Sequence, residues 1–196
     1  MTERHASTAP SPWIARFATL VPRGAHVLDV AAGRGRHARL FAARGARVLA
    51  VDTDADALAE VAEVDGVTTR VADLEAGAWP FGDARFDAIV VVHYLHRPLF
   101  PSLLAALAPD GVLLYETFAA GNERFGRPAN PAFLLAPNEL LERVAGRLAV
   151  VAFEQGRVDD HGGSRVVQRI AAVGHARPWP PALPGASSER PPALPC

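Results

Sequence analysis

Three aspartates and a glycine-rich turn are the residues of this sequence best suited to holding a ligand. Asp29 lies inside a short apolar run that leads into the turn Gly33-Arg34-Gly35, and Asp52 and Asp73 each follow a further apolar run. Closely spaced glycines let the chain turn sharply and let a ligand approach the backbone. A carboxylate near the end of a buried strand is unfavourable unless a cation or hydrogen-bond donors meet it. The pattern therefore predicts a binding site for a ligand that carries several hydrogen-bond donors.

Each of the three carboxylates suits a different group of a nucleoside ligand. Asp52 can accept both hydroxyls of a ribose. Asp73 can accept the amino group of adenine, and the backbone N–H of Leu74 can meet a ring nitrogen. Asp29 can meet an ammonium group, although it could instead pair with an arginine or cap a turn. One such acid alone is usually a solvated residue, but three of them at the ends of successive strands favour a binding site.

An alternation of strands and helices would position these residues. Apolar runs predict strands over residues 27–31, 48–51, 67–71, 86–92 and 112–117. Helical spacing and capping residues predict helices over residues 11–20, 36–44, 53–63 and 98–107. This alternation is typical of a parallel sheet with helices on both faces. Because such sheets bind ligands beyond the carboxyl ends of their strands, we expect the three aspartates to share one edge.

The pattern changes after the last of these strands. Residues 119–136 lack clear periodicity and could form a lid, in which the candidate contacts are Asn122, Phe125 and Arg127. A helix is predicted near residues 137–146. Two apolar runs follow, 148–158 and 165–173, and they predict an antiparallel hairpin that closes the sheet.

The composition is that of a folded protein. Hydrophobic residues make up 49% and charged residues 21%, and the net charge is -1 at pH 7. There is no basic excess that would favour a nucleic acid. Lysine does not occur, so no lysine amine can act as a base or form a Schiff base. We expect one domain over residues 11–176 and a proline-rich, disordered tail over residues 177–196.

The single cysteine, Cys196, allows no internal disulfide, which favours a reducing compartment. Residues 1–12 contain no apolar run that resembles a signal peptide. No apolar stretch reaches the length that a bilayer requires. We therefore expect a cytoplasmic protein without a membrane partner, and the sequence leaves its oligomeric state open.

Three segments together resemble the class I S-adenosylmethionine-dependent methyltransferases. The family's first motif, D/E-x-G-x-G-x-G, is similar to VLDVAAGRGRHARLFAARGARVLAVD, its adenine-binding motif to VADL, and its fourth-strand motif to FDAIVVVHYLH. The likeness covers roughly residues 11–175. Gly-Arg-His after the turn resembles a small bacterial branch related to tellurite-resistance-type methyltransferases. The resemblance implies an α/β, Rossmann-like fold: a seven-stranded, mostly parallel sheet with helices on both faces and a C-terminal antiparallel hairpin.

The resemblance also implies S-adenosylmethionine as cofactor and a set of residues that contact it. These residues are Asp29, Ala31, Gly33, Gly35, Asp52, Thr53, Asp73, Leu74 and His93. The ammonium group on the methionine half of the cofactor is a partner for Asp29. One position departs from the pattern, since Ala31 stands where the family has its first glycine. Because alanine has less backbone freedom than glycine, we expect a negative φ there.

Methyl transfer is an in-line displacement at a carbon that the sulfonium already activates, so the protein mainly positions the nucleophile and excludes water. Catalytic candidates follow the predicted strand 86–92, and they are His93 and Tyr94, with His96 and Arg97 close behind. His93 could act as a base or orient the substrate, or it could be a neutral side chain bound to a loop carbonyl. Tyr94 could instead be core packing. Glu116 could act on the substrate or pair with an arginine.

The acceptor that this pattern favours is a small molecule. Family members that methylate amino groups of DNA or proteins usually carry Asn/Asp-Pro-Pro-Tyr/Phe after the fourth strand, where this chain has Val92-His93-Tyr94-Leu95. Together with the near-neutral charge, this difference makes a nucleic-acid acceptor unexpected. With one cysteine and scattered histidines, we also expect no metal site.

Two other functions fit parts of the sequence. Gly33, Gly35 and Ala38 match the relaxed dinucleotide fingerprint, so an NAD- or FAD-dependent Rossmann oxidoreductase is one alternative. Asp29 and Asp73 have no role in that scheme, and the hairpin also disagrees with it. The other alternative is a non-catalytic module that binds the cofactor without turnover.

Overall fold

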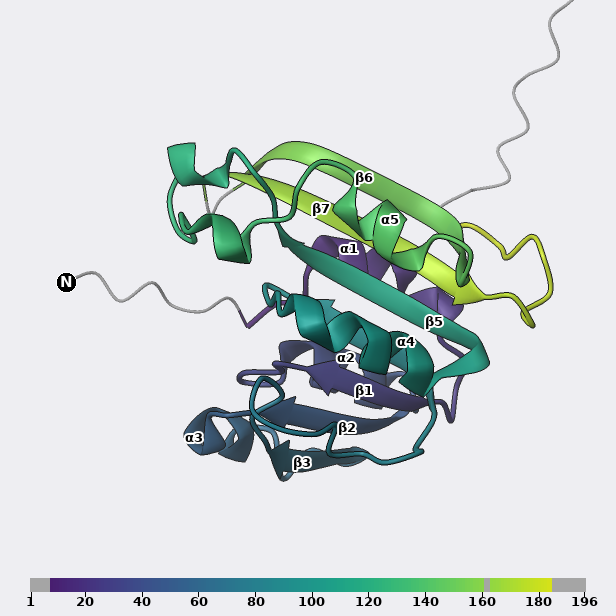
Figure 1. Ribbon diagram of the computed structural model, residues 1–196. Coiled ribbons are helices and arrows are strands. Elements are labelled where there is room, and N and C mark those ends of the chain that lie inside the picture. Colours follow the sequence, from purple (N-terminus) through teal and green to yellow (C-terminus); the bar gives the residue numbers. More distant parts are fainter. Residues whose placement is uncertain (1–7, 161–162, 185–196) are drawn as a thin grey trace, which may run out of the picture.

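A twisted sheet forms the centre of the computed structural model, which describes residues 8–160 and 163–184 (Figure 1). In these residues the sheet has seven strands in the order β3-β2-β1-β4-β5-β7-β6. The bounds are β1 His26–Val30, β2 Arg47–Asp52, β3 Val67–Val71, β4 Phe86–Val92, β5 Leu107–Phe118, β6 Leu148–Asp160 and β7 Gly163–Gly174. Strands β1 to β5 run parallel, whereas β7 is antiparallel to both β5 and β6. The predicted fold class is confirmed.

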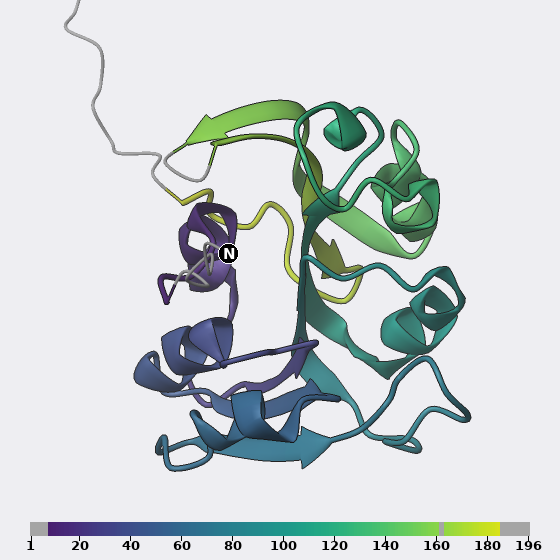
Figure 2. The same cartoon turned by 90° about the vertical axis from the view of Figure 1, so that its left-hand side faces the viewer.

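Helices cover both faces of the sheet (Figure 2). Their bounds are α1 Pro12–Phe17, α2 Arg36–Ala43, α3 Ala55–Ala59, α4 Phe100–Ala106 and α5 Glu139–Val144, with short 3-10 turns η1 Ala18–Leu20, η2 Arg97–Leu99, η3 Asn122–Arg124 and η4 Pro131–Phe133. Helices α1, α2 and α3 pack in one apolar layer, and α4 and α5 pack in the other. None of the helices in the described ranges has the length and apolar character needed to cross a membrane.

The alternation of side chains along each strand decides which face a polar group meets. In β1, Leu28 and Val30 pack in the α4–α5 layer, so Asp29 between them faces α1 and α2. In β5, Tyr115 packs in the α4–α5 layer, so Glu116 beside it also faces α1 and α2. Two buried carboxylates from different strands therefore share one face of the sheet.

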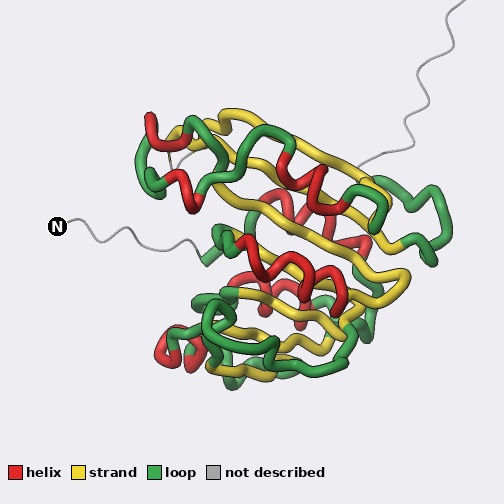
Figure 3. Tube along the Cα trace, viewed as in Figure 1, coloured by secondary structure: helices red, strands yellow, loops and turns green. Residues whose placement is uncertain are grey.

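Long irregular connections lie next to the regular elements. Residues 72–85 join β3 to β4, and residues 119–138 follow β5 (Figure 3). The second connection contains only the two short turns η3 and η4, in agreement with the predicted lack of periodicity. Its Ala119 forms a parallel bridge to Leu135, which folds the segment back on itself.

Several elements differ in length from the prediction. Helix α3 ends at Ala59, and Val61 leaves the helix to pack directly against Gly35. Strand β5 begins at Leu107 instead of residue 112, because Leu107 already pairs with Phe86 before an irregularity in the register. Helix α5 is also shorter than the predicted span of residues 137–146. The periodic pattern places each element correctly, but it does not show such long-range packing.

Candidate functional site

A cavity of about 210 Å³ lies beyond the carboxyl ends of β1, β2, β3 and β4. Its lining residues are Ala31, Val51, Asp52, Thr53, Ala72, Asp73, Leu74, Glu75 and Tyr94. Five of the predicted cofactor contacts thus meet in one place, together with the predicted catalytic residue Tyr94. The sequence pattern does not single out Glu75, because an acid in a loop is usually solvated.

The glycine turn connects this cavity to helix α2. The Gly33 N–H donates to Asp52 Oδ2 at 2.7 Å, which ties the turn to β2. Gly33 and Gly35 have φ values of 52° and 69°, in the left-handed region that favours glycine. A Cβ at Gly33 would have no neighbour within 4 Å, whereas one at Gly35 would lie 2.6 Å from Val61 Cγ2. Gly33 therefore leaves room for ligand atoms, and Gly35 lets Val61 pack against the turn.

The prediction of a negative φ at Ala31 is wrong. Its φ is 53°, not negative. The Ala32 N–H donates to the carbonyl of Val51 at 3.0 Å, and the Gly35 N–H donates to the carbonyl of Ala32 at 3.0 Å. These bonds fix the turn on both sides of the sheet edge, at a cost of about 1–2 kcal/mol for a left-handed alanine. The chain keeps a glycine-like conformation although it carries an alanine.

The two cavity aspartates are held in place by backbone N–H groups. Asp52 Oδ1 accepts from the N–H of Asp54 at 3.0 Å, in addition to the bond from the turn. Asp73 Oδ1 accepts from the N–H groups of Glu75 at 2.8 Å and Ala76 at 3.3 Å. A carboxylate has about four lone-pair positions, so both side chains can still accept hydrogen bonds from a ligand.

Asp29 does not line the cavity but lies within β1, two residues before Ala31. It is 1% exposed, and its Oδ2 is buried without a hydrogen-bond partner in the described part of the chain. Burial raises the pKa of Asp29 to about 7, although a backbone hydrogen bond from Ala38 and the charge of Arg36 oppose this. Such a carboxylate is stabilised most by a cation that comes close to it.

Further polar side chains lie on the same face of the sheet as Asp29. Glu116 is 1% exposed, and its Oε2 accepts from Ser11 Oγ at 2.5 Å. The Ser11 N–H donates to His37 Nε2 at 3.1 Å, and burial lowers the pKa of His37 to about 3, so the ring is neutral and can accept. Arg36 brings its positive charge near both Glu116 and Asp29. The Ser11 hydroxyl and the charge of Arg36 therefore both stabilise the buried Glu116 carboxylate.

His93 follows β4 in an unusual backbone conformation, with a φ of 59°. Its N–H donates to the carbonyl of Glu116 at 2.9 Å, and its exposed ring stacks on Phe118 at 4.8 Å between centroids. Partial withdrawal from water and the charges of Arg36 and Arg165 lower the pKa of His93 to about 4. In the residues that the structure describes, no hydrogen bond reaches the ring nitrogens, so the alternative of a bond to a loop carbonyl is not realised.

The comparisons with known proteins agree with this geometry. A family model described as a methyltransferase domain matches residues 27–111. The structure of TehB from Haemophilus influenzae is similar with a TM-score of 0.72 and 18% identity, over 88% of this chain and 65% of TehB. A TehB-like methyltransferase from Corynebacterium glutamicum is similar with a TM-score of 0.57 and 21% identity, over 82% of this chain and 85% of that one. Residues 27–111, which hold the glycine turn and strands β2 to β4, are thus similar to a methyltransferase domain, and the fold resembles that of TehB-like methyltransferases.

A third similar structure carries ligands. It is the 1,6-didemethyltoxoflavin-N1-methyltransferase from Burkholderia thailandensis, with 1,6-didemethyltoxoflavin and S-adenosylhomocysteine bound. It is similar to this chain with a TM-score of 0.58 and 27% identity, over 81% of this chain and 74% of that one. The search of curated proteins gives no match. This chain spans 65% of the length of TehB.

The residues of the candidate site fit S-adenosylmethionine. Gly33 leaves open space where a ligand would approach the turn, and the cavity beside it carries carboxylates that can accept from hydroxyl and amino groups. The unpartnered Oδ2 of Asp29 fits the ammonium group of the methionine half. A nicotinamide dinucleotide has no ammonium group that would meet Asp29, and the match of residues 27–111 to a methyltransferase domain favours S-adenosylmethionine.

The remaining candidates have other partners. Arg97 does not line the cavity. Its guanidinium contacts both carboxylate oxygens of Glu139 at 2.9 Å and donates to the carbonyls of Ala132 and Leu134. The amide of Asn122 donates to the carbonyl of Pro128 and accepts from the N–H of Val166. Both side chains hold the irregular connection after β5 in place.

Tyr94 lines the cavity, and His96 contacts the lining residue Glu75 without lining the cavity itself. The Tyr94 hydroxyl is buried without a hydrogen-bond partner in the described ranges, and burial raises its pKa, with the nearby Glu75 acting in the same direction. His96 Nδ1 lies 3.5 Å from Glu75 Oε2. Glu75, which the sequence pattern does not single out, therefore contacts His96 and lies near the Tyr94 hydroxyl.

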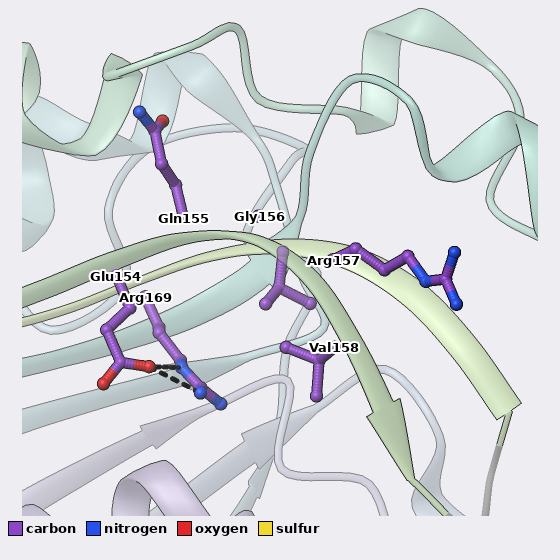
Figure 4. A pocket seen from close by; sticks show the side chains of 7 residues that line it. Glu154, Gln155, Gly156, Arg157, Val158 and Arg169 are labelled. Atoms are coloured by element: carbon purple, nitrogen blue, oxygen red, sulfur yellow. Dashed lines mark hydrogen bonds and ion pairs between the residues drawn. The ribbon is translucent and has the colours of Figure 1, made fainter.

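A second hollow, of about 110 Å³, lies on the β6–β7 hairpin (Figure 4). It is lined by Glu154, Gln155, Gly156, Arg157, Val158, Val167 and Arg169. Glu154 and Arg169 form an ion pair of 2.6 Å, and Glu154 also pairs with Arg16 of α1 at 3.4 Å. These contacts fix the hairpin to α1, and none of the predicted site residues reaches this hollow.

Substituting the two turn glycines should separate binding from stability. Gly33→Val should abolish binding of S-adenosylhomocysteine, because its side chain fills the open space, while the free energy of unfolding changes by less than about 2 kcal/mol. Gly35→Ala should lower the free energy of unfolding by about 2–4 kcal/mol, because its Cβ overlaps Val61 at a positive φ. Calorimetric titration and urea denaturation measure the two effects. Wild-type affinity in Gly33→Val would show that the turn does not hold the cofactor.

Proposed function

We propose that this methyltransferase transfers a methyl group from S-adenosylmethionine to a small-molecule acceptor by in-line displacement. The observation that carries the proposal is the cavity in which Asp52 and Asp73 lie beside the Gly33 turn. In this proposal Asp52 accepts the ribose hydroxyls, and Asp73 and the N–H of Leu74 meet the adenine. Asp29 faces the ammonium group from the other side of the turn.

The reacting end of the site lies at His93 in this proposal. When bound, S-adenosylmethionine supplies a methyl carbon on a positively charged sulfur, which a nucleophile displaces in line. Tyr94 lines the cavity and His93 precedes it, so an acceptor beside His93 is next to the outer end of the cofactor. The bond from the His93 N–H to Glu116 and the stack on Phe118 preset the direction of the ring.

His93 is suited to accept a proton rather than to donate one. With a pKa of about 4, its ring is neutral at pH 7, and a ring nitrogen can accept a hydrogen bond from an O–H, N–H or S–H group of the acceptor. The proton then moves to this nitrogen as the nucleophile forms its bond to carbon. The low pKa makes His93 a weak base, which is sufficient for a displacement that the sulfonium already activates.

Three observations support a small acceptor. The chain after β4 lacks the Asn/Asp-Pro-Pro-Tyr/Phe segment of amino-methylating family members, and the net charge of -1 offers no attraction to a polyanion. The similar enzyme from Burkholderia thailandensis holds 1,6-didemethyltoxoflavin together with S-adenosylhomocysteine. We assign the methyltransferase domain to residues 11–176, with residues 177–196 as a proline-rich tail, and the lone Cys196 agrees with action in the cytoplasm.

Transfer of a labelled methyl group to a panel of thiols, phenols, amines and metalloid oxyanions tests the proposal. We expect product from at least one class. His93→Asn should lower kcat for that acceptor by about a hundredfold, because the proton acceptor is lost. The dissociation constant of S-adenosylhomocysteine should stay the same. Asparagine suits this position because it tolerates the positive φ of residue 93.

The matched control is His175→Asn, which changes an exposed histidine after β7. It should retain the wild-type kcat. Cofactor binding without product from any acceptor would favour a non-catalytic module. An unchanged kcat in His93→Asn would remove His93 from the proton transfer and leave the methyltransferase assignment intact.

A further inference from the structure

A row of residues crosses the α1–α2 face of the sheet from the end of β4 to β6. His93 follows β4, and its ring stacks on Phe118 of β5 with 4.8 Å between the centroids. Phe118 pairs with Val167 of β7, and Val167 pairs with Gly156 of β6. Directly paired residues share one face of a sheet, and Phe118 lies two residues after Glu116, so the whole row lies on the α1–α2 face.

This row ends in the hollow of about 110 Å³ on the β6–β7 hairpin. Gly156 has no side chain, and a Cβ there would meet no atom within 4 Å. Val167 is 1% exposed and forms an apolar floor. Glu154 and Val158 point to the same side of the hairpin, whereas Gln155 points to the other (Figure 4). Because an apolar cavity of about 150 Å³ holds one benzene ring, an open hollow of this size suits a single ring.

The charged side chains that border the hollow already have partners. Arg169 pairs with Glu154 at 2.6 Å, and Arg16 of α1 contacts the same carboxylate at 3.4 Å. The guanidinium of Arg169 also lies over the ring of Trp13, 5.1 Å from its centroid. Because these charges compensate one another, an occupant of the hollow needs no charge of its own and would bind through its apolar surface.

The hollow is continuous with the reacting end of the site at His93. Neighbouring strands lie about 4.8 Å apart, so two strand spacings, about 10 Å, separate Phe118 from Gly156. Burial and the charges of Arg36 and Arg165 lower the pKa of His93, and Arg165 lies near the start of β7, so this end of the hairpin is close to the ring. An acceptor whose reacting atom lies beside His93 therefore reaches the hollow if it is about 10 Å long.

We propose that the hollow on the β6–β7 hairpin binds the distal ring of an uncharged aromatic acceptor, whose nucleophilic group lies beside His93 and whose first ring lies along Phe118. This inference rests on the proposed function and narrows its acceptor class. A one-ring acceptor or a metalloid oxyanion is too short to occupy both places. An acceptor with two linked rings gains affinity because its second ring buries apolar surface against Val158 and Val167.

Pairs of acceptors that differ by one ring test this proposal. The pairs are phenol and 4-phenylphenol, thiophenol and 4-phenylthiophenol, and aniline and 4-aminobiphenyl, with selenite as the oxyanion. In the class that gives product, the two-ring member should have a KM at least about tenfold lower, because its second ring is buried in the hollow. Its kcat should agree with that of the one-ring member within about threefold, since the second ring lies away from the reacting atom.

Val158→Phe fills the hollow with a ring of the protein itself. It should raise the KM of the two-ring acceptor to that of the one-ring acceptor, and it should leave the one-ring KM and the affinity for S-adenosylhomocysteine within about twofold. Val150→Phe is the matched control, because Val150 is an exposed residue of the same strand that does not line the hollow. Val158→Thr keeps the shape of valine but adds a hydroxyl, so it should fold and retain only part of the two-ring advantage.

The outcomes separate this inference from the proposed function. Product from selenite or from acceptors without a second ring alone would overturn the inference and leave methyl transfer to a small molecule intact. The same holds for a two-ring advantage that persists in Val158→Phe, or in Val158→Thr if the first variant does not fold. No product from any acceptor of either panel, despite binding of S-adenosylhomocysteine, would instead overturn the proposed function, and this inference with it.

Discussion

Asp52→Ala should weaken binding of S-adenosylhomocysteine by about a hundredfold, which corresponds to about 2–3 kcal/mol. The reason is that the substitution removes two kinds of contact at once. In the proposed complex the ribose hydroxyls lose a charged acceptor. In the free protein the Gly33 N–H loses the Oδ2 that holds the turn at 2.7 Å. Calorimetric titration at constant salt measures the change.

Asp54 provides the control for this prediction. Its Oδ1 accepts from the Ala57 N–H at 2.9 Å and caps helix α3. Asp54→Ala should therefore lower the free energy of unfolding by about 1 kcal/mol and leave the affinity for S-adenosylhomocysteine unchanged. If Asp52→Ala retained wild-type affinity, Asp52 would not belong to the cofactor site, and its role would be limited to the turn.

Asp29→Asn should stabilise the free protein at pH 8 while it weakens cofactor binding. The pKa of Asp29 rises from 3.8 to about 7 on folding, so between these values the folded state binds more protons than the unfolded state. Stability from this group is therefore complete below pH 4 and is lost as the pH rises to 7. The loss above pH 7 is on the order of 4 kcal/mol, and asparagine avoids it because it carries no charge.

Urea denaturation at pH 4 and pH 8 checks this prediction. The stability advantage of Asp29→Asn over wild type should be present at pH 8 and small at pH 4, and its affinity for S-adenosylhomocysteine should fall at least tenfold. Asp110→Asn, at an exposed position, should show no such difference between the two pH values. An equal stability difference between Asp29→Asn and wild type at both pH values would contradict the raised pKa of the buried Asp29 carboxyl.

The sequence predicts the fold and the cavity aspartates well because both follow from local patterns. The apolar runs correctly locate all seven strands, and parallel pairing then brings the ends of β2 and β3 together. Asp52 and Asp73 follow from this arrangement without any knowledge of tertiary contacts. The conformation of Ala31 does not follow, since its positive φ is imposed by hydrogen bonds of neighbouring residues.

The contacts among the polar side chains Ser11, His37 and Glu116 on the α1–α2 face could not be predicted in the same way. Ser11 and Glu116 are 105 positions apart in the sequence, and their hydrogen bond depends on how α1 docks against β5. His37 is noted in the sequence only as part of Gly-Arg-His, and its hydrogen bond with the backbone of Ser11 could not be predicted from that motif. Arg36 is the exception, since its place directly after the glycine turn is visible in the sequence.

The division of the sheet into two unlike faces has a practical consequence. Asp29 and Glu116 both lie on the α1–α2 face, while α4 and α5 cover the opposite face with an apolar layer. Five lining residues of the ligand cavity nevertheless pack in this apolar layer, namely Ala31, Val51, Ala72, Leu74 and Tyr94. Repacking the layer to raise thermal tolerance should therefore leave these five positions unchanged and vary Leu103 or Leu140, which do not line the cavity.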